Sequence, residues 1–253
     1  MSRAFVGGLG LCAPGHSGTA TWSAAFPGME VSEATGDLLP PALRRRASSL
    51  ARMAVAVAGQ AAHQAGVDLS SVPLILGSAY GEIVAAVEMM GEFGGATALP
   101  SPIRFHNSVH NAAAAYLSIA SGNHGFSTAL AAGAATPVAA VLEAVALLGE
   151  RGGDALLVLL DEPPPAPFER AVPYPAAAAA FCLSSRPGPR TLAALSEPRR
   201  GSTPRADLPD GLERHPCAGA FALLAAVTSR RSATVSLGAD GVGAWLVDVS
   251  PVP

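Results

Sequence analysis

The sequence contains no lysine, and all 16 of its basic residues are arginine. This absence excludes Schiff-base catalysis, which needs an amine nucleophile, and a P-loop, which needs a lysine beside the nucleotide phosphates. Charged residues of both signs make up only 14% of the chain, and the net charge is -3. Because there is no basic surplus, we do not expect nucleic acid to be a partner.

Cysteine is also scarce. The three cysteines, Cys12, Cys182 and Cys217, lie far apart and form no CxxC pair, so the sequence predicts neither a disulfide framework nor a zinc knuckle. We therefore expect a reducing, cytoplasmic location, with no metal or other cofactor. The longest apolar span, residues 129–149, is interrupted by Pro137, which indicates a buried helix rather than a membrane span.

Apolar residues make up 50% of the chain, which is enough to build a core. Their periodicity in the first two thirds alternates between strand and helix patterns. This alternation predicts a mostly parallel α/β sheet covered by helices. The expected strands are 4–11, 72–78, 125–129 and 155–160, and the expected helices are 41–65, 81–93, 112–121 and 137–151, with 104–111 as an irregular connection.

The last third of the chain has a different texture. A strand is expected at 176–184, followed by an exposed connection rich in Pro, Arg, Gly and Asp at 186–214. A helix at 217–227 and two strands at 234–237 and 244–249 complete the predicted elements.

Two short motifs are open to more than one interpretation. Residues 8–13 match the G-x-G-x-x-A form of the dinucleotide fingerprint, but turn residues follow it where a helix N-terminus should face the pyrophosphate. His106 and His110 have the spacing of two metal ligands on one helix face, yet no third ligand is suitably spaced. Loop histidines that form hydrogen bonds with Asn107 and Asn111 are the simpler interpretation.

A third motif, residues 125–129, resembles the G-x-S-x-G nucleophile elbow. Ser127, Asp161 and His215 also occur in the chain order of hydrolase triads. An elbow needs its nucleophile at the apex between strand and helix, whereas the predicted strand continues past Ser127 and places Leu130 at the apex. A serine hydrolase or acyltransferase that uses Ser127 stays open as an alternative.

Residues 127–133, with the sequence STALAAG, resemble the STACASG segment of β-ketoacyl-acyl-carrier-protein synthases, with Leu130 in place of the acyl-accepting cysteine. Other segments agree in order over residues 3–185. The FHNSVHN run is most similar to short synthase-like subunits of aryl polyene pathways. The agreeing segments are 5–10, 45–66, 74–81 and 111–119, and the FHNSVHN run is 105–111.

This resemblance implies a thiolase-like (ketosynthase) α/β fold in a single domain, 1–253. Residues 1–185 would form the N-terminal half and residues 186–253 an abbreviated C-terminal half. Leu130 cannot carry an acyl group, and the surroundings of His215 do not resemble the HGTGT motif of the family. The resemblance therefore implies a chain-length factor without catalytic activity of its own. Such a subunit would form a heterodimer with an active β-ketoacyl synthase and meet the acyl carrier protein through that complex.

The resemblance also suggests where the functional residues lie. The helix expected at 81–93 would border the acyl tunnel, and the polar loop with the strand at 125–129 would contribute to the interface. A scaffold that binds the carrier protein without contacting acyl chains stays open as a further alternative. The tunnel candidates are Ile83, Val84, Val87, Met89 and Met90, and the interface candidates are Phe105, His106, Asn107, His110, Asn111, Ser127 and Thr128.

Overall fold

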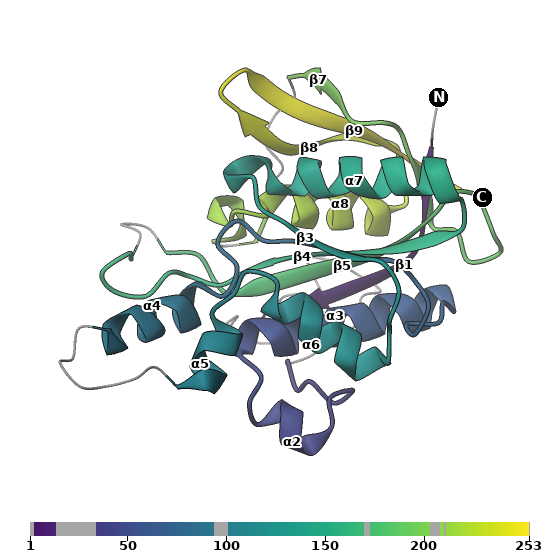
Figure 1. Cartoon of the computed structure of the whole chain (residues 1–253). Coiled ribbons are helices and arrows are strands. Elements are labelled where there is room, and N and C mark those ends of the chain that lie inside the picture. Colours follow the sequence, from purple (N-terminus) through teal and green to yellow (C-terminus); the bar gives the residue numbers. More distant parts are fainter. Residues whose placement is uncertain are drawn as a thin grey trace.

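The computed structural model describes residues 3–13, 34–93, 101–169, 173–202, 208–209 and 211–252. Helices and strands alternate along these residues (Figure 1). The strands are β1 (Ala4–Cys12), β2 (Leu74–Gly77), β3 (Ser127–Leu130), β4 (Asp154–Asp161), β5 (Ala177–Ser184), β6 (Ala193–Leu195), β7 (Arg199–Gly201), β8 (Ala233–Asp240) and β9 (Gly243–Pro251). The helices are α2 (Pro41–Arg44), α3 (Ser49–Ala65), α4 (Ile83–Glu92), α5 (Pro102–Asn107), α6 (Ala112–Ser121), α7 (Thr136–Arg151) and α8 (Ala218–Ser229).

The described strands form one sheet in the order β3-β2-β4-β5-β1-β6-β9-β7, with β8 paired to β9. Figure 1 shows that this sheet curls around two helices: α7 and α8 lie between the strands β1 to β5 below and β8 and β9 above. The helices α3 and α6 cover the lower face. Two apolar cores result, one on each side of the lower strands.

The expectation of a mostly parallel sheet is wrong. Only β2 pairs in parallel, with β3 and with β4, whereas the other strand pairs are antiparallel. Parallel neighbours need a long crossover, and helices α4 to α7 provide these connections. The connection from β4 to β5 contains no helix in its described part, and β5 returns antiparallel beside β4.

Three local expectations also need correction. The helix expected at 41–65 is divided, because Ser48 has an extended backbone and caps α3 by accepting a hydrogen bond from the Ala51 amide. The segment expected to be an irregular connection contains the short helix α5. The segment 186–214, expected to be an exposed connection, contributes β6 and β7 to the sheet, with Ala193 and Leu195 buried.

The two glycines of the G-x-G motif have a packing role. A Cβ atom on Gly8 would lie 2.1 Å from the Ala61 carbonyl oxygen, and one on Gly10 would lie 2.1 Å from that of Val57. Strand β1 therefore lies directly against the α3 backbone. From α3, Gln64 accepts a hydrogen bond from the Leu9 amide. Close approach of a helix to a strand accounts for the motif without a nucleotide.

Replacing Gly10 with alanine is expected to lower the free energy of unfolding by about 3 kcal/mol or more, because the methyl group would overlap backbone that cannot move alone. Gly91 is the matched control. No atom lies within 4 Å of a Cβ built at Gly91, which lies within α4, so Gly91→Ala should stabilise the protein by about 0.5 to 1 kcal/mol. Urea unfolding of the two variants measures both effects. Equal effects of the two substitutions would contradict this packing.

Candidate functional site

The turn from β3 into α7 has the form of a nucleophile elbow without a nucleophile. Strand β3 ends at Leu130, whose carbonyl oxygen accepts a hydrogen bond from the Ser78 amide at 3.0 Å. One 3-10 turn later α7 begins at Thr136, whose hydroxyl accepts a hydrogen bond from the Ala132 amide and donates one to the Gly133 carbonyl. The half-buried side chain at the end of the strand is aliphatic. This position cannot form a covalent acyl bond.

A buried carboxylate joins the ends of the neighbouring strands beside this elbow. Asp161, the last residue of β4, is 0% exposed. One of its oxygens accepts hydrogen bonds from the Ser78 hydroxyl at 2.7 Å and the Tyr80 amide at 3.0 Å. The other oxygen accepts from the Ala79 amide at 2.9 Å and from the Cys217 thiol at 3.3 Å. Burial raises the pKa of Asp161, and these donors oppose that rise.

The other polar groups of this network are structural. The Cys217 amide donates to Nδ1 of His215, which leaves Nε2 to donate to the Asp161 carbonyl oxygen. Burial lowers the pKa of His215 to about 4 and raises that of the Cys217 thiol. A neutral imidazole with both nitrogens bonded to the backbone is not available as a general base. The protonated thiol is not a nucleophile.

The structure separates the three residues of the hydrolase alternative. Ser127 is the first residue of β3 and pairs with Leu74, which in turn pairs with Leu156 on β4. Asp161 is five residues further along β4, which corresponds to about 16 Å along the strand direction. His215 lies at that distant end, where its ring contacts the Asp161 carbonyl. Ser127 therefore lies at the opposite end of these strands from Asp161 and His215.

Helix α4 follows the Asp161 network and carries the predicted tunnel residues. The turn before it needs glycine, since Gly81 has φ +59° and a Cβ there would lie 2.7 Å from the His110 ring. No residue of α4 is buried. Met89 lies against α5, where its sulfur accepts a hydrogen bond from Ser108, whereas Met90 is 50% exposed. Ile83, Val84 and Val87 are half-buried.

The predicted polar-loop residues lie on or next to α5, where two of them, His106 and Asn107, contact Tyr116. Asn107 donates a hydrogen bond to the Arg46 carbonyl and accepts one from the Tyr116 hydroxyl, so it ties α5 to the start of α3. The ring of His106 packs edge-on against that of Tyr116, whereas His110 bonds to the Ser78 carbonyl. The two histidines therefore have separate partners. Phe105 is 58% exposed and Asn111 is exposed at the start of α6.

Strand β3 is the edge of the sheet, and the structure shows nothing paired with its outer side in the described part of the chain. Ser127 is exposed and Thr128 is half-buried. Helices α6 and α7 both contact β3, and each carries an exposed large apolar side chain, since Ile119 of α6 is 53% exposed and Leu142 of α7 is 40% exposed. An open edge strand beside exposed apolar side chains is the form of a surface that pairs with another chain.

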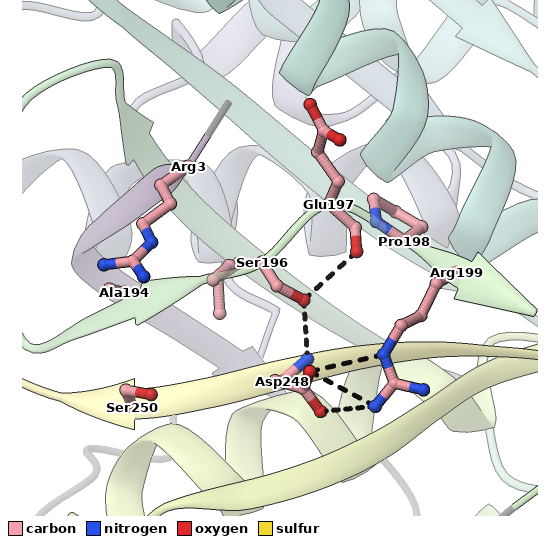
Figure 2. A pocket seen from close by; sticks show the side chains of 9 residues that line it. Arg3, Ala194, Ser196, Glu197, Pro198, Arg199, Asp248 and Ser250 are labelled. Carbon is pink, nitrogen blue, oxygen red and sulfur yellow. Dashed lines mark hydrogen bonds and ion pairs between the residues drawn. The ribbon is translucent and has the colours of Figure 1, made fainter. Parts of the chain in front are cut away.

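One cavity lies away from the elbow, and another lies beside His215. Figure 2 shows one of about 450 Å³ beside β6 and β9, where Arg199 forms a forked ion pair with Asp248 and Arg3 lies near Ala194. A smaller cavity, of about 320 Å³, lies beside His215 and α8. The charges of Arg199 and Asp248 neutralise each other in this ion pair. No group of His, Cys, Asp or Glu side chains in the described ranges could hold a metal ion.

The family of the chain follows from comparison of its sequence with family models. Residues 20–244 match the model described as Beta-ketoacyl synthase, N-terminal domain. The chain belongs to this β-ketoacyl synthase family. Its fold is the thiolase-like ketosynthase fold. A search of curated proteins finds no match.

Solved structures support the same fold. A chain of the complex of the ketosynthase ApeO with its chain length factor ApeC, from Xenorhabdus doucetiae, is 19% identical with a TM-score of 0.72; the match covers 98% of this chain and 99% of that one. A chain of AntDE:AntF, a type II polyketide synthase acyl-carrier protein in complex with its ketosynthase, is 11% identical with a TM-score of 0.74, and both chains are covered completely.

A β-ketoacyl synthase from Burkholderia phymatum differs in extent. It is 15% identical with a TM-score of 0.54, and the match covers 73% of this chain and 59% of that one. In the matches to the ApeO–ApeC and AntDE:AntF complexes, by contrast, the alignment covers nearly all of both chains. Those chains therefore have nearly the same length as the present chain. Within the described residues, one helix, Gly133–Arg151, is long and apolar enough to cross a membrane, but its packing between the two layers of strands is that of a core helix.

Proposed function

We propose that this chain is a chain-length factor: a ketosynthase-like subunit that forms a heterodimer with an active β-ketoacyl synthase and shapes the acyl tunnel during polyene or polyketide synthesis. The single observation that carries the proposal is that β3 ends at the aliphatic Leu130, directly before the turn into α7. We take Leu130 to stand at the position of the family's nucleophile. Similarity in length and fold to chains of ketosynthase complexes, one of them with a chain length factor, supports it.

The open edge of β3 is the proposed heterodimer interface. An edge strand whose outer amides and carbonyls lack partners is stabilised by pairing with another strand. Ile119 and Leu142, on the two helices that contact β3, provide apolar contacts beside it. The small residues after the strand, Ala131 to Ala134, are exposed and permit close approach of a partner backbone.

The proposal includes the remaining expectations for this homologue. Residues 186–253 act as an abbreviated second half, since α8, β8 and β9 enclose α7 in its place. Binding of the acyl carrier protein takes place through the complex, and the working location is the cytoplasm. No cofactor is needed, because the partner provides the nucleophile. The structure offers no support for the Ser127 hydrolase.

The first prediction is chemical. The isolated chain is expected to form no covalent adduct with an acyl carrier protein thioester, because Leu130 has no nucleophilic atom. Leu130→Cys should not restore condensation, since His215 is buried and bonded to the backbone and cannot activate the new thiol. Intact-protein mass spectrometry and a condensation assay measure the two outcomes. An acyl adduct on the unmodified chain would contradict the proposal.

The second prediction concerns assembly. Expressed alone, the protein should self-associate or be poorly soluble, and co-expression with its synthase should yield a stable heterodimer. Ile119→Arg combined with Leu142→Arg should weaken the heterodimer at least about tenfold, because two charges would be buried in the interface. Val242→Arg is the control, since Val242 is 85% exposed in the turn between β8 and β9. Analytical ultracentrifugation measures the dissociation constant, and equal effects would exclude this interface.

The third prediction concerns the acyl tunnel. Met90→Trp should shorten the product of the reconstituted complex without abolishing synthesis, whereas Met90→Ala should permit longer chains, because a flexible thioether side chain at the wall is being enlarged or removed. Met89 is a less suitable target, because its sulfur is engaged by Ser108. Val242→Trp should leave the product unchanged. Mass spectrometry gives the chain-length distribution, and an unchanged distribution in an intact complex would show that α4 does not set product length.

A further inference from the structure

Polar contacts attach helix α4 to the rest of the protein at both of its ends. Near its C-terminal end, Glu92 forms an ion pair with Arg104 of α5, and Met89 accepts a hydrogen bond from Ser108. No residue of the helix itself is buried, although most of its side chains are apolar.

The contacts at its first turn involve two buried carboxyl groups. Glu82, immediately before the helix, is 1% exposed and accepts a hydrogen bond from the Ser48 hydroxyl at 2.8 Å. Glu162, directly after β4, is 6% exposed, and its carboxyl group interacts with the Val84 amide in the first turn. Two buried carboxyl groups therefore contact the N-terminal end of α4.

This acidic pair lacks a compensating cation in the described part of the chain, where the ion pairs formed involve other residues. The second carboxyl oxygen of Glu82 is buried and has no hydrogen-bond partner. Asp161 from β4 and Glu88 from α4 face Glu162, and both are acidic. Tyr116 from α6 faces Glu82 and also faces Arg46. His110 lies against Gly81, directly before Glu82, where its ring bonds to the Ser78 carbonyl. An ionised carboxylate in such a setting is costly, whereas a protonated one is not.

We propose that Glu82 and Glu162 form a proton-operated latch, which keeps the first turn of α4 docked while the carboxyl groups are protonated and loosens it when they ionise. Burial is the main cause of a raised pKa at both carboxyl groups, and the pKa of each group is raised to about 7. The charge of Glu162 adds to the rise at Glu82, and the Ser48 and Val84 donors oppose the rise at their respective carboxyl groups.

The direction of the pH dependence follows from these values. Each group binds its proton more tightly in the folded protein than in the unfolded chain, where the pKa is near the ordinary value of 4.5. The stabilisation is therefore complete below about pH 4.5 and is lost as the pH rises to about 7. Docking of α4 should weaken over the same interval. The latch concerns the attachment of α4, so it holds whether or not α4 borders an acyl chain.

Hydrogen exchange of the full-length protein between pH 5.5 and 8.5 tests the latch, with rates corrected for the intrinsic pH dependence of exchange. Amides in the first turn of α4 should lose about tenfold in protection over this range, whereas those of the buried helix α7 should not. Glu82→Gln and Glu162→Gln should remove the pH dependence. Glu150→Gln, at an exposed site on α7, should behave like the wild type.

Two results would overturn the latch: α4 protection that does not change with pH in the wild type, or glutamine variants that keep the wild-type response. Should the glutamine variants fail to fold, Ser48→Ala provides an independent test. Removing this donor takes away a contact that lowers the pKa of Glu82. The midpoint of the pH-dependent loss of α4 protection should therefore move to higher pH. The loss of the α3 cap lowers overall stability without moving that midpoint. An unmoved midpoint would also contradict the proposal.

Discussion

The arrangement of the candidate site depends on one buried carboxylate. Asp161 ends β4 and receives donors from the turn that follows β2 and from Cys217, which directly precedes α8. This carboxylate therefore connects the turn leading into α4 with the C-terminal part of the chain. An unpaired charge at that depth would be strongly destabilising, so the donors must converge on it for the protein to fold. The same convergence fixes the ends of β2 and β4 beside the elbow at Leu130.

The C-terminal part of this β-ketoacyl synthase homologue covers the core with few elements, mainly helix α8 and strands β8 and β9. Helix α8 is buried on nearly every side, and β8 and β9 cover α7 and α8 from above (Figure 1). No helix in the described ranges covers the outer side of these strands in that view. Charged residues occupy that region, where Arg199 pairs with Asp248 and Arg200 pairs with Asp240. A polar outer surface lets a two-strand layer end the fold without a further helical layer.

Much of the fold could be predicted from the sequence, because apolar periodicity and glycine positions report on local structure. The core helix at Thr136–Arg151 and the buried strand at Asp154–Asp161 agree with the expected elements. Strand direction could not be predicted in this way, because it depends on whether a connection contains a helix. The short strands β6 and β7 were missed, because their Pro- and Arg-rich surroundings are typical of loops.

The site was predicted less completely than the fold. The resemblance identified Leu130 at the elbow, which the structure places at the end of β3. The roles of Ser78, Cys217 and Glu82 were missed. These residues are far apart in sequence, and the sequence shows that each is polar but not that they converge around Asp161 and the start of α4. The sequence signal that indicates such a network is an acidic residue placed directly before a predicted helix or directly after an apolar strand. Asp161 and His215 were noted for a catalytic role, and the structure gives them a structural one.

The central claim is that the free edge of β3 pairs with an active synthase, and hydrogen exchange of that strand measures it directly. Among the residues that the structure describes, no strand pairs with the outward-facing amides of Ser127–Leu130. When a saturating amount of the cognate synthase is added, exchange of these amides should slow at least about tenfold, because inter-strand hydrogen bonds form. The turn between β8 and β9 should exchange at its former rate. Unchanged exchange across β3 in the presence of bound synthase would contradict the account.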